Sequence, residues 1–447
     1  MSSIGPTTID HAPRIAAVAP PASTGQAFSN RYLRVALAIL FLINMVNYMD
    51  RFIMSILVEP VRKEFNLTDT QAGLLTGLAF SFIYSLLIVP VARLSDRFSR
   101  RKVLVVAVAA WSVLTVLCGA ASSYVALLFA RAGVGVGEAA GLPASHSLAS
   151  DFFPPRRRAM ALSIIGLGGA VGSTLGLIIG GFVSQHYGWR EAFLVAGLPG
   201  LLLAIVVALF LRDPPRGGTD ATAGVASMPA PKFSAVLRLL LRRKAYVHIV
   251  AGVTLASLST MGFASWTPAF FMRVHHLPAA ELSLWLTGAH IAGAFVGTMV
   301  GGWLCTRFFR PDGSILLRVM SAAFLLVPIL GAVVVLVPTS SSALLANIPL
   351  SFIMAIWLPA YYASQQELAG ATYRATASAF GLIFFNLIGT GLGPLIVGKL
   401  SDLFAAQAGE ASLRYALLLS FSFCIWGALH IRLAARSMAA DIASARA

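Results

Sequence analysis

Residues 44–51 read Asn-Met-Val-Asn-Tyr-Met-Asp-Arg, and they lie inside an apolar run that extends from about residue 33 to about residue 58. A run of this length can cross a bilayer, which needs about 20 mostly apolar residues. Asp50 and Arg51 therefore lie at membrane depth, where a charge costs roughly 2.5–3.5 kcal/mol and usually marks an ion path, a proton relay or a ligand site. The alternative is a structural ion pair, or a helix that ends at Met49 and leaves both charges in water.

The polar residues of this stretch form a stripe. Asn44, Asn47 and Arg51 follow i, i+3, i+7 spacing, which places them on one helix face with Asp50 at its margin. In an otherwise apolar helix, such a face is expected to point into the protein.

Composition indicates that most of the chain lies in a membrane. Of the 447 residues, 58% are hydrophobic and 11% are charged, and the mean hydropathy is +0.82; soluble domains carry about 25% charged residues. The net charge of +16 would suit nucleic-acid binding, but the basic residues fall in short gaps between apolar runs, as the positive-inside rule predicts. The three cysteines are far apart and have no disulfide or metal-ligand spacing, so we expect no metal and no cofactor.

The apolar runs predict an all-α membrane protein with about twelve transmembrane helices. They are expected at about residues 33–58, 70–94, 102–121, 124–150, 159–184, 192–211, 246–271, 281–305, 315–337, 343–368, 376–402 and 412–433.

The chain divides into two halves of six spans each. Residues 212–245 are polar, strongly basic and rich in Pro and Gly, which is typical of a linker between an N-terminal bundle, 31–211, and a C-terminal bundle, 246–436. Residues 1–30 lack an apolar segment and predict a disordered tail rather than a signal peptide, and 437–447 form a second tail. The linker is basic, so we expect it and both termini to be cytoplasmic.

Short patterns recur at corresponding spans. The second span ends Ala-Arg-Leu-Ser-Asp at 92–96, the eighth ends Gly-Trp-Leu-Cys-Thr-Arg at 302–307, and the eleventh ends Gly-Lys-Leu-Ser-Asp at 398–402. Glycines spaced by four residues occur in the fifth span at 172–181 and in the eleventh at 389–393. Nested three-helix repeats would give such similarity, and the two bundles are therefore expected to be pseudo-symmetric.

The loop after the second span carries a family resemblance. Residues 92–102 read Ala-Arg-Leu-Ser-Asp-Arg-Phe-Ser-Arg-Arg-Lys. This resembles the Gly-x-Leu-Ala-Asp-Arg-x-Gly-Arg-Arg loop of the major facilitator superfamily, with Ala92 and Ser99 in place of the two glycines. The resemblance implies the major facilitator fold and a gate on the cytoplasmic side. The residues of this gate motif are Asp96, Arg97, Arg100 and Arg101.

The fourth span carries a second charged pair. Arg131 and Glu138 are seven residues apart and share a helix face, about 10.5 Å apart along the axis. Adjacent residues of a helix do not face each other, so Asp50 should find its partner on another helix. We predict the pairs Asp50–Arg131 and Arg51–Glu138, with protonation of Asp50 releasing the helices. The alternative is a tight packing face with an incidental ion pair.

A more specific resemblance rests on three short stretches. Asn-Tyr-Met-Asp-Arg at 47–51, Gly-Val-Gly-Glu-Ala at 135–139 and Asp-Pro-Pro-Arg-Gly at 213–217 are similar to the spinster-type subgroup, whose members move lysophospholipids and sphingolipids. The resemblance implies proton-sensitive carboxylates at Asp50 and Glu138 and a lipid-like substrate. Some bacterial organic-anion carriers share the Asp-Arg pair.

The second half lacks charges at membrane depth but is rich in aromatic residues. We expect a lopsided cavity, in which the first half holds a charged head group and the second an alkyl chain; aromatic residues that face lipid or core are the alternative. The expected lining residues are Asn44, Asn47, Tyr48, Trp266, Phe270, Trp357, Tyr361, Phe384 and Asn386.

These features favour a proton-coupled secondary transporter of amphipathic lipids that works by alternating access. A carrier of small organic anions on the same fold is the alternative. An intramembrane enzyme would need a nucleophile and base, or metal ligands, clustered at one depth, and a channel should be more symmetric. We expect a monomer in a bacterial inner membrane that binds protons, its substrate and membrane lipids, but no nucleic acid.

Overall fold

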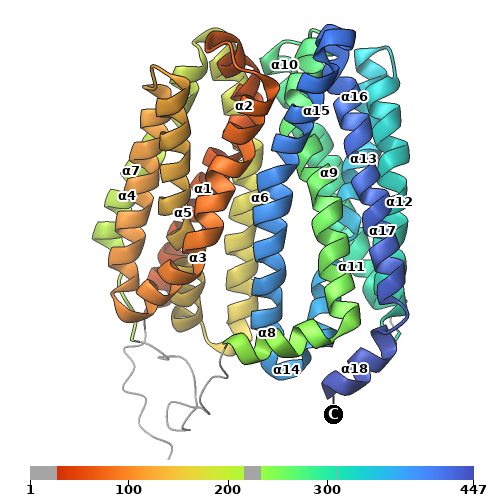
Figure 1. Ribbon diagram of the computed structural model, residues 1–447. Coiled ribbons are helices and arrows are strands. Elements are labelled where there is room, and N and C mark those ends of the chain that lie inside the picture. Colours follow the sequence, from red (N-terminus) through yellow and green to blue (C-terminus); the bar gives the residue numbers. More distant parts are fainter. Residues whose placement is uncertain (1–27, 216–232, 309, 447) are drawn as a thin grey trace, which may run out of the picture.

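The computed structural model describes residues 28–215, 233–308 and 310–446, and within these ranges the chain is helical without β-strands. Figure 1 shows two groups of upright helices side by side, one formed by the chain up to α7 and the other by the chain from α9 onward. Much of the expected linker, and the tail 1–27, lie outside the described residues.

The N-terminal half contains seven α-helices and one π-helical stretch, because the second span is built from three consecutive elements. Its elements are α1 (Asn30–Glu64), α2 (Asp69–Gly73), the π-helical η1 (Leu74–Leu78), α3 (Ala79–Arg97), α4 (Arg100–Gly119), α5 (Tyr124–Phe152), α6 (Pro155–His186) and α7 (Trp189–Phe210).

The C-terminal half follows a short helix, α8 (Phe233–Arg242), and several of its spans are interrupted. Its elements are α9 (Lys244–Val274), α10 (Ala279–Ala289), η2 (His290–Phe295), α11 (Val296–Arg307), α12 (Ser314–Leu336), α13 (Ser340–Ile356), α14 (Leu358–Phe384), η3 (Phe385–Leu392), α15 (Gly393–Ala408), η4 (Gly409–Ala411), α16 (Ser412–Ser420), α17 (Ser422–Ala434) and α18 (Met438–Arg446).

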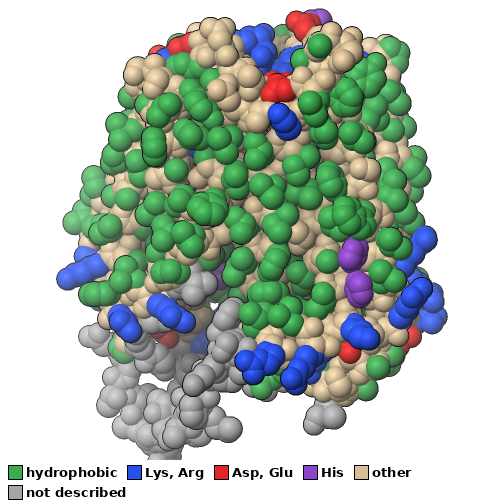
Figure 2. Space-filling view, in the orientation of Figure 1, with side chains coloured by type: hydrophobic (Ala, Val, Ile, Leu, Met, Phe, Trp, Pro, Cys, Tyr) green, Lys and Arg blue, Asp and Glu red, His purple; other side chains and the backbone are tan. Residues whose placement is uncertain are grey.

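The lengths of the helices support the expected number of spans. Eleven stretches of the described chain are long and apolar enough to cross a membrane. The last, Thr376–Ala434, has 59 residues and holds two crossings, because one needs about 20. Figure 2 shows hydrophobic side chains over the middle of the visible face and charged side chains at its two ends, as a bilayer requires.

Several helices start where a hydroxyl side chain caps them. Ser29, Ser99 and Ser123 each accept a hydrogen bond from a backbone N–H three residues ahead. Thr68 and Gln71 form a reciprocal capping box at the start of α2. These caps satisfy N–H groups that a helix leaves unpaired at its first turn, and they fix the short turns between spans.

Glycines allow α6 to lie directly against α1. A Cβ at Gly168 or Gly176 would lie 2.5 Å from the carbonyl oxygen of Phe41 or Met49, and one at Gly172 would collide with the carbonyl of Met45. Only glycine permits this backbone approach, which recurs every four residues along α6.

The two halves contact each other at the end away from α8. The contacts join α2 to α15, η1 to α15 and η3, α3 to η3, α1 to α9, and α6 to α10. Figure 1 shows α2, α10 and the end of α15 at one end of the molecule and α8 at the other. The described contacts between the halves therefore close the end opposite the linker.

Candidate functional site

Helices α1 and α5 bring two charged pairs together in the N-terminal half. Nη2 and Nε of Arg51 lie 2.7 and 3.2 Å from Oε2 of Glu138. The side chain of Arg51 is 18% exposed, and that of Glu138 is fully buried.

The second pair is looser and more deeply buried. Nη1 of Arg131 lies 4.0 Å from Oδ1 of Asp50, and each side chain is 1% exposed. The hydroxyl of Thr115 on α4 donates to the other carboxylate oxygen of Asp50. The structure thus contains both pairs that helix geometry predicts, and Thr115 is a contact that no sequence pattern indicated.

Both pairs are incompletely hydrogen-bonded. Oδ1 of Asp50, Oε1 of Glu138 and two guanidinium nitrogens of Arg131 have no hydrogen-bond partner among the residues that the structure describes. Buried charges normally satisfy their hydrogen-bonding groups, because an unpaired one costs several kcal/mol. The arrangement is therefore suited to a change of protonation or of partner, and less to a purely structural ion pair.

Aromatic rings surround Arg51. Its guanidinium lies 5.3 Å from the ring centroid of Tyr48 and 4.8 Å from those of Phe80 and Tyr84 on α3. Such contacts stabilise a cation outside bulk water. Neither Phe80 nor Tyr84 is predicted by the sequence, since aromatic residues in an apolar span have no distinguishing pattern.

The structure gathers only some of the expected cavity residues near these charges. Tyr48 contacts Arg51, and Asn47 lies near Glu138. Asn44 instead donates to the backbone carbonyl of Ile165, 2.8 Å away, and so joins α1 to α6.

The expected cavity residues of the C-terminal half do not lie together. Trp266 and Phe270 are 1% and 0% exposed, and the Trp266 indole donates to the carbonyl of Pro394 at the closed end. Trp357 and Tyr361 are buried with their ring centroids 6.1 Å apart.

The remaining two, Phe384 and Asn386, are partly exposed, and Asn386 donates within its own helix to Leu382. Tyr362 of α14 lies within electrostatic range of Tyr48 across the two halves.

The gate motif makes its described contacts inside the N-terminal half. Arg100 pairs with Asp151 at the end of α5 and, at 3.2 Å, with Asp213 beyond α7. Arg101 donates to the carbonyl of Ala208. Arg97 is exposed, and the side chain of Asp96 lies outside the described residues.

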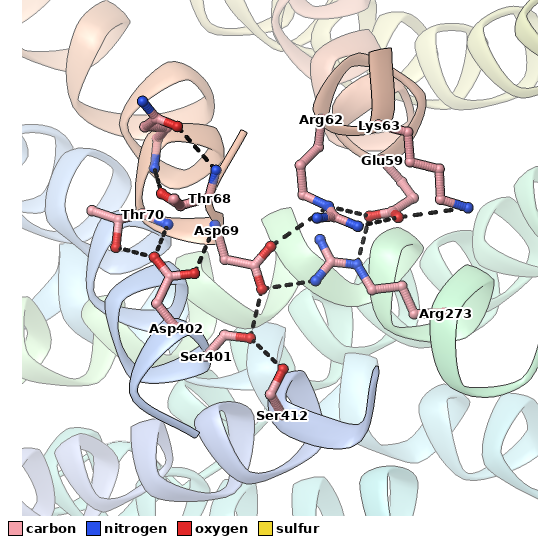
Figure 3. A network of polar contacts seen from close by, with 11 residues as sticks. Glu59, Arg62, Lys63, Thr68, Asp69, Thr70, Arg273, Ser401, Asp402 and Ser412 are labelled. Carbon is pink, nitrogen blue, oxygen red and sulfur yellow. Dashed lines mark hydrogen bonds and ion pairs between the residues drawn. The ribbon is translucent and has the colours of Figure 1, made fainter. Parts of the chain in front are cut away.

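A second polar network, drawn in Figure 3, joins the two halves at the closed end. We call it the inter-half network; its members are Glu59, Arg62, Asp69, Thr70, Arg273, Ser401 and Asp402. Arg273 of α9 is its centre, because Nε lies 2.5 Å from Glu59 and Nη1 lies 2.7 Å from Asp69.

The end of α15 completes this network. The carboxylate of Asp402 accepts hydrogen bonds from the backbone N–H groups of Asp69 and Thr70, at 2.9 and 2.8 Å, and so caps α2 from the other half. Ser401 donates to Asp69 at 2.6 Å. The sequence signal was the repeated Leu-Ser-Asp ending of the second and eleventh spans, which indicated an internal repeat but not a contact between halves.

Comparison with known proteins identifies the family. The model described as Major Facilitator Superfamily matches residues 40–394. The chain belongs to this superfamily. The predicted fold class, twelve helices in two bundles of the major facilitator type, is confirmed.

Three curated relatives are similar in sequence to this superfamily member over most of its length. It is 31% identical over 386 residues to an MFS-type efflux pump of Mycolicibacterium smegmatis, which covers 86% of this chain and 88% of the pump. It is 30% identical over 394 residues to protein spinster homolog 1 of Homo sapiens, covering 82% and 72%. It is 28% identical over 384 residues to a probable sulfoacetate transporter of Cupriavidus necator, covering 82% and 86%.

A solved structure agrees with these relatives. A bacterial homologue of the human lysosomal transporter Spinster, in an inward-facing and unoccupied conformation, matches with a TM-score of 0.80 at 27% identity, over 93% of this chain and 99% of that one. The protein is thus a spinster-type membrane transporter and not an enzyme, as its motifs predict.

Proposed function

We propose that this transporter carries amphipathic lipids, of lysophospholipid or sphingolipid type, and couples their movement to protons by alternating access. The observation that carries the proposal is the pair of buried carboxylates, Asp50 and Glu138, each facing an arginine and each with one oxygen that no described residue hydrogen-bonds. Carboxylates at membrane depth are costly, and they commonly serve as proton relays.

Arg51 connects the proton to the substrate. It is the partly exposed member of its pair, so it is the charge that an incoming anionic head group reaches first. When Glu138 takes up a proton it loses its charge, and Arg51 becomes free to bind that head group. Proton uptake and head-group binding then favour each other. The proton neutralises Glu138, and the head group takes the place of Glu138 as the partner of Arg51.

The place between Tyr48 and Tyr362 is our candidate for the head group. Tyr48 of α1 contacts Arg51, and Tyr362, on α14 of the other half, lies within electrostatic range of Tyr48. A substrate at this position contacts both halves and therefore responds when one half tilts against the other.

The inter-half network supports an assignment of state and orientation. It holds the end away from the linker closed, and the linker end carries the basic loops that the positive-inside rule assigns to the cytoplasm. We infer an inward-facing state, with both termini cytoplasmic in a bacterial inner membrane.

A carrier of small organic anions is the second candidate. The similarity to a probable sulfoacetate transporter favours it, and Arg51 suits a sulfonate or carboxylate as well as a phosphate. The two candidates differ in the alkyl chain, because only a lipid carrier gains affinity as the chain lengthens.

The proton coupling is tested with the Asp50→Asn and Glu138→Gln variants in vesicles that carry an imposed pH gradient. We expect transport to lose its dependence on the gradient, since the amide cannot exchange a proton in this range. Asp312→Asn is the matched control: the backbone N–H of Ser314 donates to Asp312 at 3.0 Å and lowers the pKa of that exposed carboxyl, so it stays ionised at neutral pH. Unchanged gradient dependence in folded Asp50→Asn and Glu138→Gln variants would end the coupling proposal.

The substrate class is tested by thermal shift with lysolipids, sphingoid phosphates and short organic acids. A ligand at 100 times its Kd stabilises the folded state by about 2.7 kcal/mol. We expect the largest shift with single-chain lipids, growing with chain length. Equal shifts with sulfoacetate and lysolipid would favour the organic-anion carrier.

A further inference from the structure

Helix α8 directly precedes α9, the first membrane span of the C-terminal half. Its sequence is Phe-Ser-Ala-Val-Leu-Arg-Leu-Leu-Leu-Arg at 233–242. Only Arg243 separates it from α9, which begins at Lys244. Figure 1 shows α8 running across the end of the bundle, at an angle to the upright α9. Because α9 is a membrane span, α8 lies at the level of the lipid head groups on the linker side.

One face of α8 is held by the protein. Val236 and Leu240 are 3% and 0% exposed, and α8 contacts α14 and α9. Arg243, directly after the helix, is buried and donates to the backbone carbonyl of Leu368 on α14. This face therefore fixes α8 to α14 near Leu368.

The opposite face is exposed and carries two cations. Arg238, Leu241 and Arg242 follow i, i+3, i+4 spacing and so point in one direction, away from Val236 and Leu240. Leu241 is 52% exposed between the two arginines. We call these three residues the α8 surface.

The surroundings of the α8 surface are also basic. Figure 2 shows Lys and Arg side chains gathered along the end of the molecule where α8 lies. Exposed basic residues at this end of the C-terminal half include Lys244, Arg307, Arg310, Arg432 and Arg436. The α8 surface thus lies in a positive field at head-group depth.

We propose that the α8 surface binds the head groups of acidic phospholipids in the linker-side leaflet. Two arginines one turn apart present guanidinium groups that match phosphate oxygens, and the leucine between them can enter the acyl boundary, as in interfacial helices. The occupant is the membrane itself and not a soluble partner, because the surface combines cations with an exposed apolar side chain at the lipid boundary. Lipid held there also fixes the part of α14 near Leu368, through the buried face of α8.

The test compares the full-length protein in nanodiscs of phosphatidylcholine alone and of phosphatidylcholine with phosphatidylglycerol. The lipids retained after gentle release are counted by native mass spectrometry. Each surface cation favours an acidic leaflet about fivefold, so Arg238→Gln/Arg242→Gln should lower the preferential retention of phosphatidylglycerol by roughly tenfold or more. The matched control is Arg307→Gln/Arg310→Gln, which removes the same charge from the end of α11 and the turn after it and, lying outside the α8 surface, should lower the retention much less.

Three outcomes would overturn the proposal. The control pair could lose as much phosphatidylglycerol as the α8 pair, which would mean a general charge effect. The α8 pair could retain wild-type amounts. Soluble glycerol phosphate could raise the melting temperature of the wild type in phosphatidylcholine as much as phosphatidylglycerol does, which would indicate a site for free phosphate. Arg238→Lys/Arg242→Lys keeps the charge and should restore most of the retention, and an unchanged melting temperature in phosphatidylcholine shows that the variants are folded.

Discussion

Arg51 combines charge and shape in a way that a lysine cannot reproduce. Two of its nitrogens contact Glu138, and three aromatic rings surround its guanidinium. We expect Arg51→Lys to keep the charge but to lower the transport rate at limiting substrate by roughly tenfold to a hundredfold, because the forked contact and the ring stacking are lost. Transport assays in vesicles measure this. Arg31→Lys, at an exposed position of the same half, is the control, and equal rates for both variants would contradict a role for Arg51 in binding.

At the scale of single residues, the sequence predicted what helix geometry determines. Asp50 and Arg51 are adjacent and therefore point in different directions from α1. Arg131 and Glu138 are seven residues apart on one face of α5, so a separate partner for each could be inferred from these spacings. Thr115 could not be inferred, because a threonine in an apolar helix more often donates to its own backbone. Here its single hydroxyl hydrogen is within range of both acceptors, the Asp50 carboxylate and the carbonyl of Trp111, which lies 3.0 Å away.

At the scale of helices, the glycine face of α6 sets the distance to α1. A methyl group at Gly172 would collide with the Met45 carbonyl, whereas one at Gly166 on the same helix meets nothing within 4 Å. We expect Gly172→Ala to lower the free energy of unfolding by about 1–3 kcal/mol, the usual cost of overpacking. Gly166→Ala should be neutral or stabilise by up to about 1 kcal/mol, because alanine favours a helix. Thermal unfolding in detergent tests both, and equal melting temperatures would contradict the close approach of the helices.

The spans themselves could be predicted well, because length and hydropathy decide them, but their interruptions could not. The second, eighth and eleventh spans contain the π-helical stretches η1, η2 and η3. Their glycine-containing sequences are compatible with a regular helix, so packing between helices decides their form. The sequence places α8 within the expected linker, because its ten residues are too few to span a membrane.

At the scale of the whole molecule, the contact between halves was not predictable. Glu59 and Asp69 lie in the polar segment between the first two expected spans, and charges next to a span are usually solvated. Their partners Arg273 and Asp402 lie more than two hundred residues further along the chain. Only the tertiary arrangement brings these four charges to one end of the molecule, so no local pattern carries the information.

Arg273 is therefore the residue whose loss should most change the balance between the two states of the carrier. Its side chain is 7% exposed and joins Glu59 and Asp69, and breaking a buried pair by removing one partner costs about 3–5 kcal/mol. That cost falls only on the state in which this end is closed, so Arg273→Gln should shift the population toward opening at this end by at least tenfold.

Spin labels are attached at Ser122→Cys and Gln407→Cys, which are exposed positions of the two halves. Double electron–electron resonance measures the distance between the two labels, which should become longer in the variant. The matched control is Arg190→Gln, because Arg190 pairs with Glu64 at 2.5 Å within the N-terminal half, where both side chains are more than one-third exposed. The control should leave the distance unchanged, since its ion pair does not join the halves. If both variants give the wild-type distance distribution, the inter-half network does not hold this end closed, and the closure must come from apolar packing of α2 and α6 against α15 and α10.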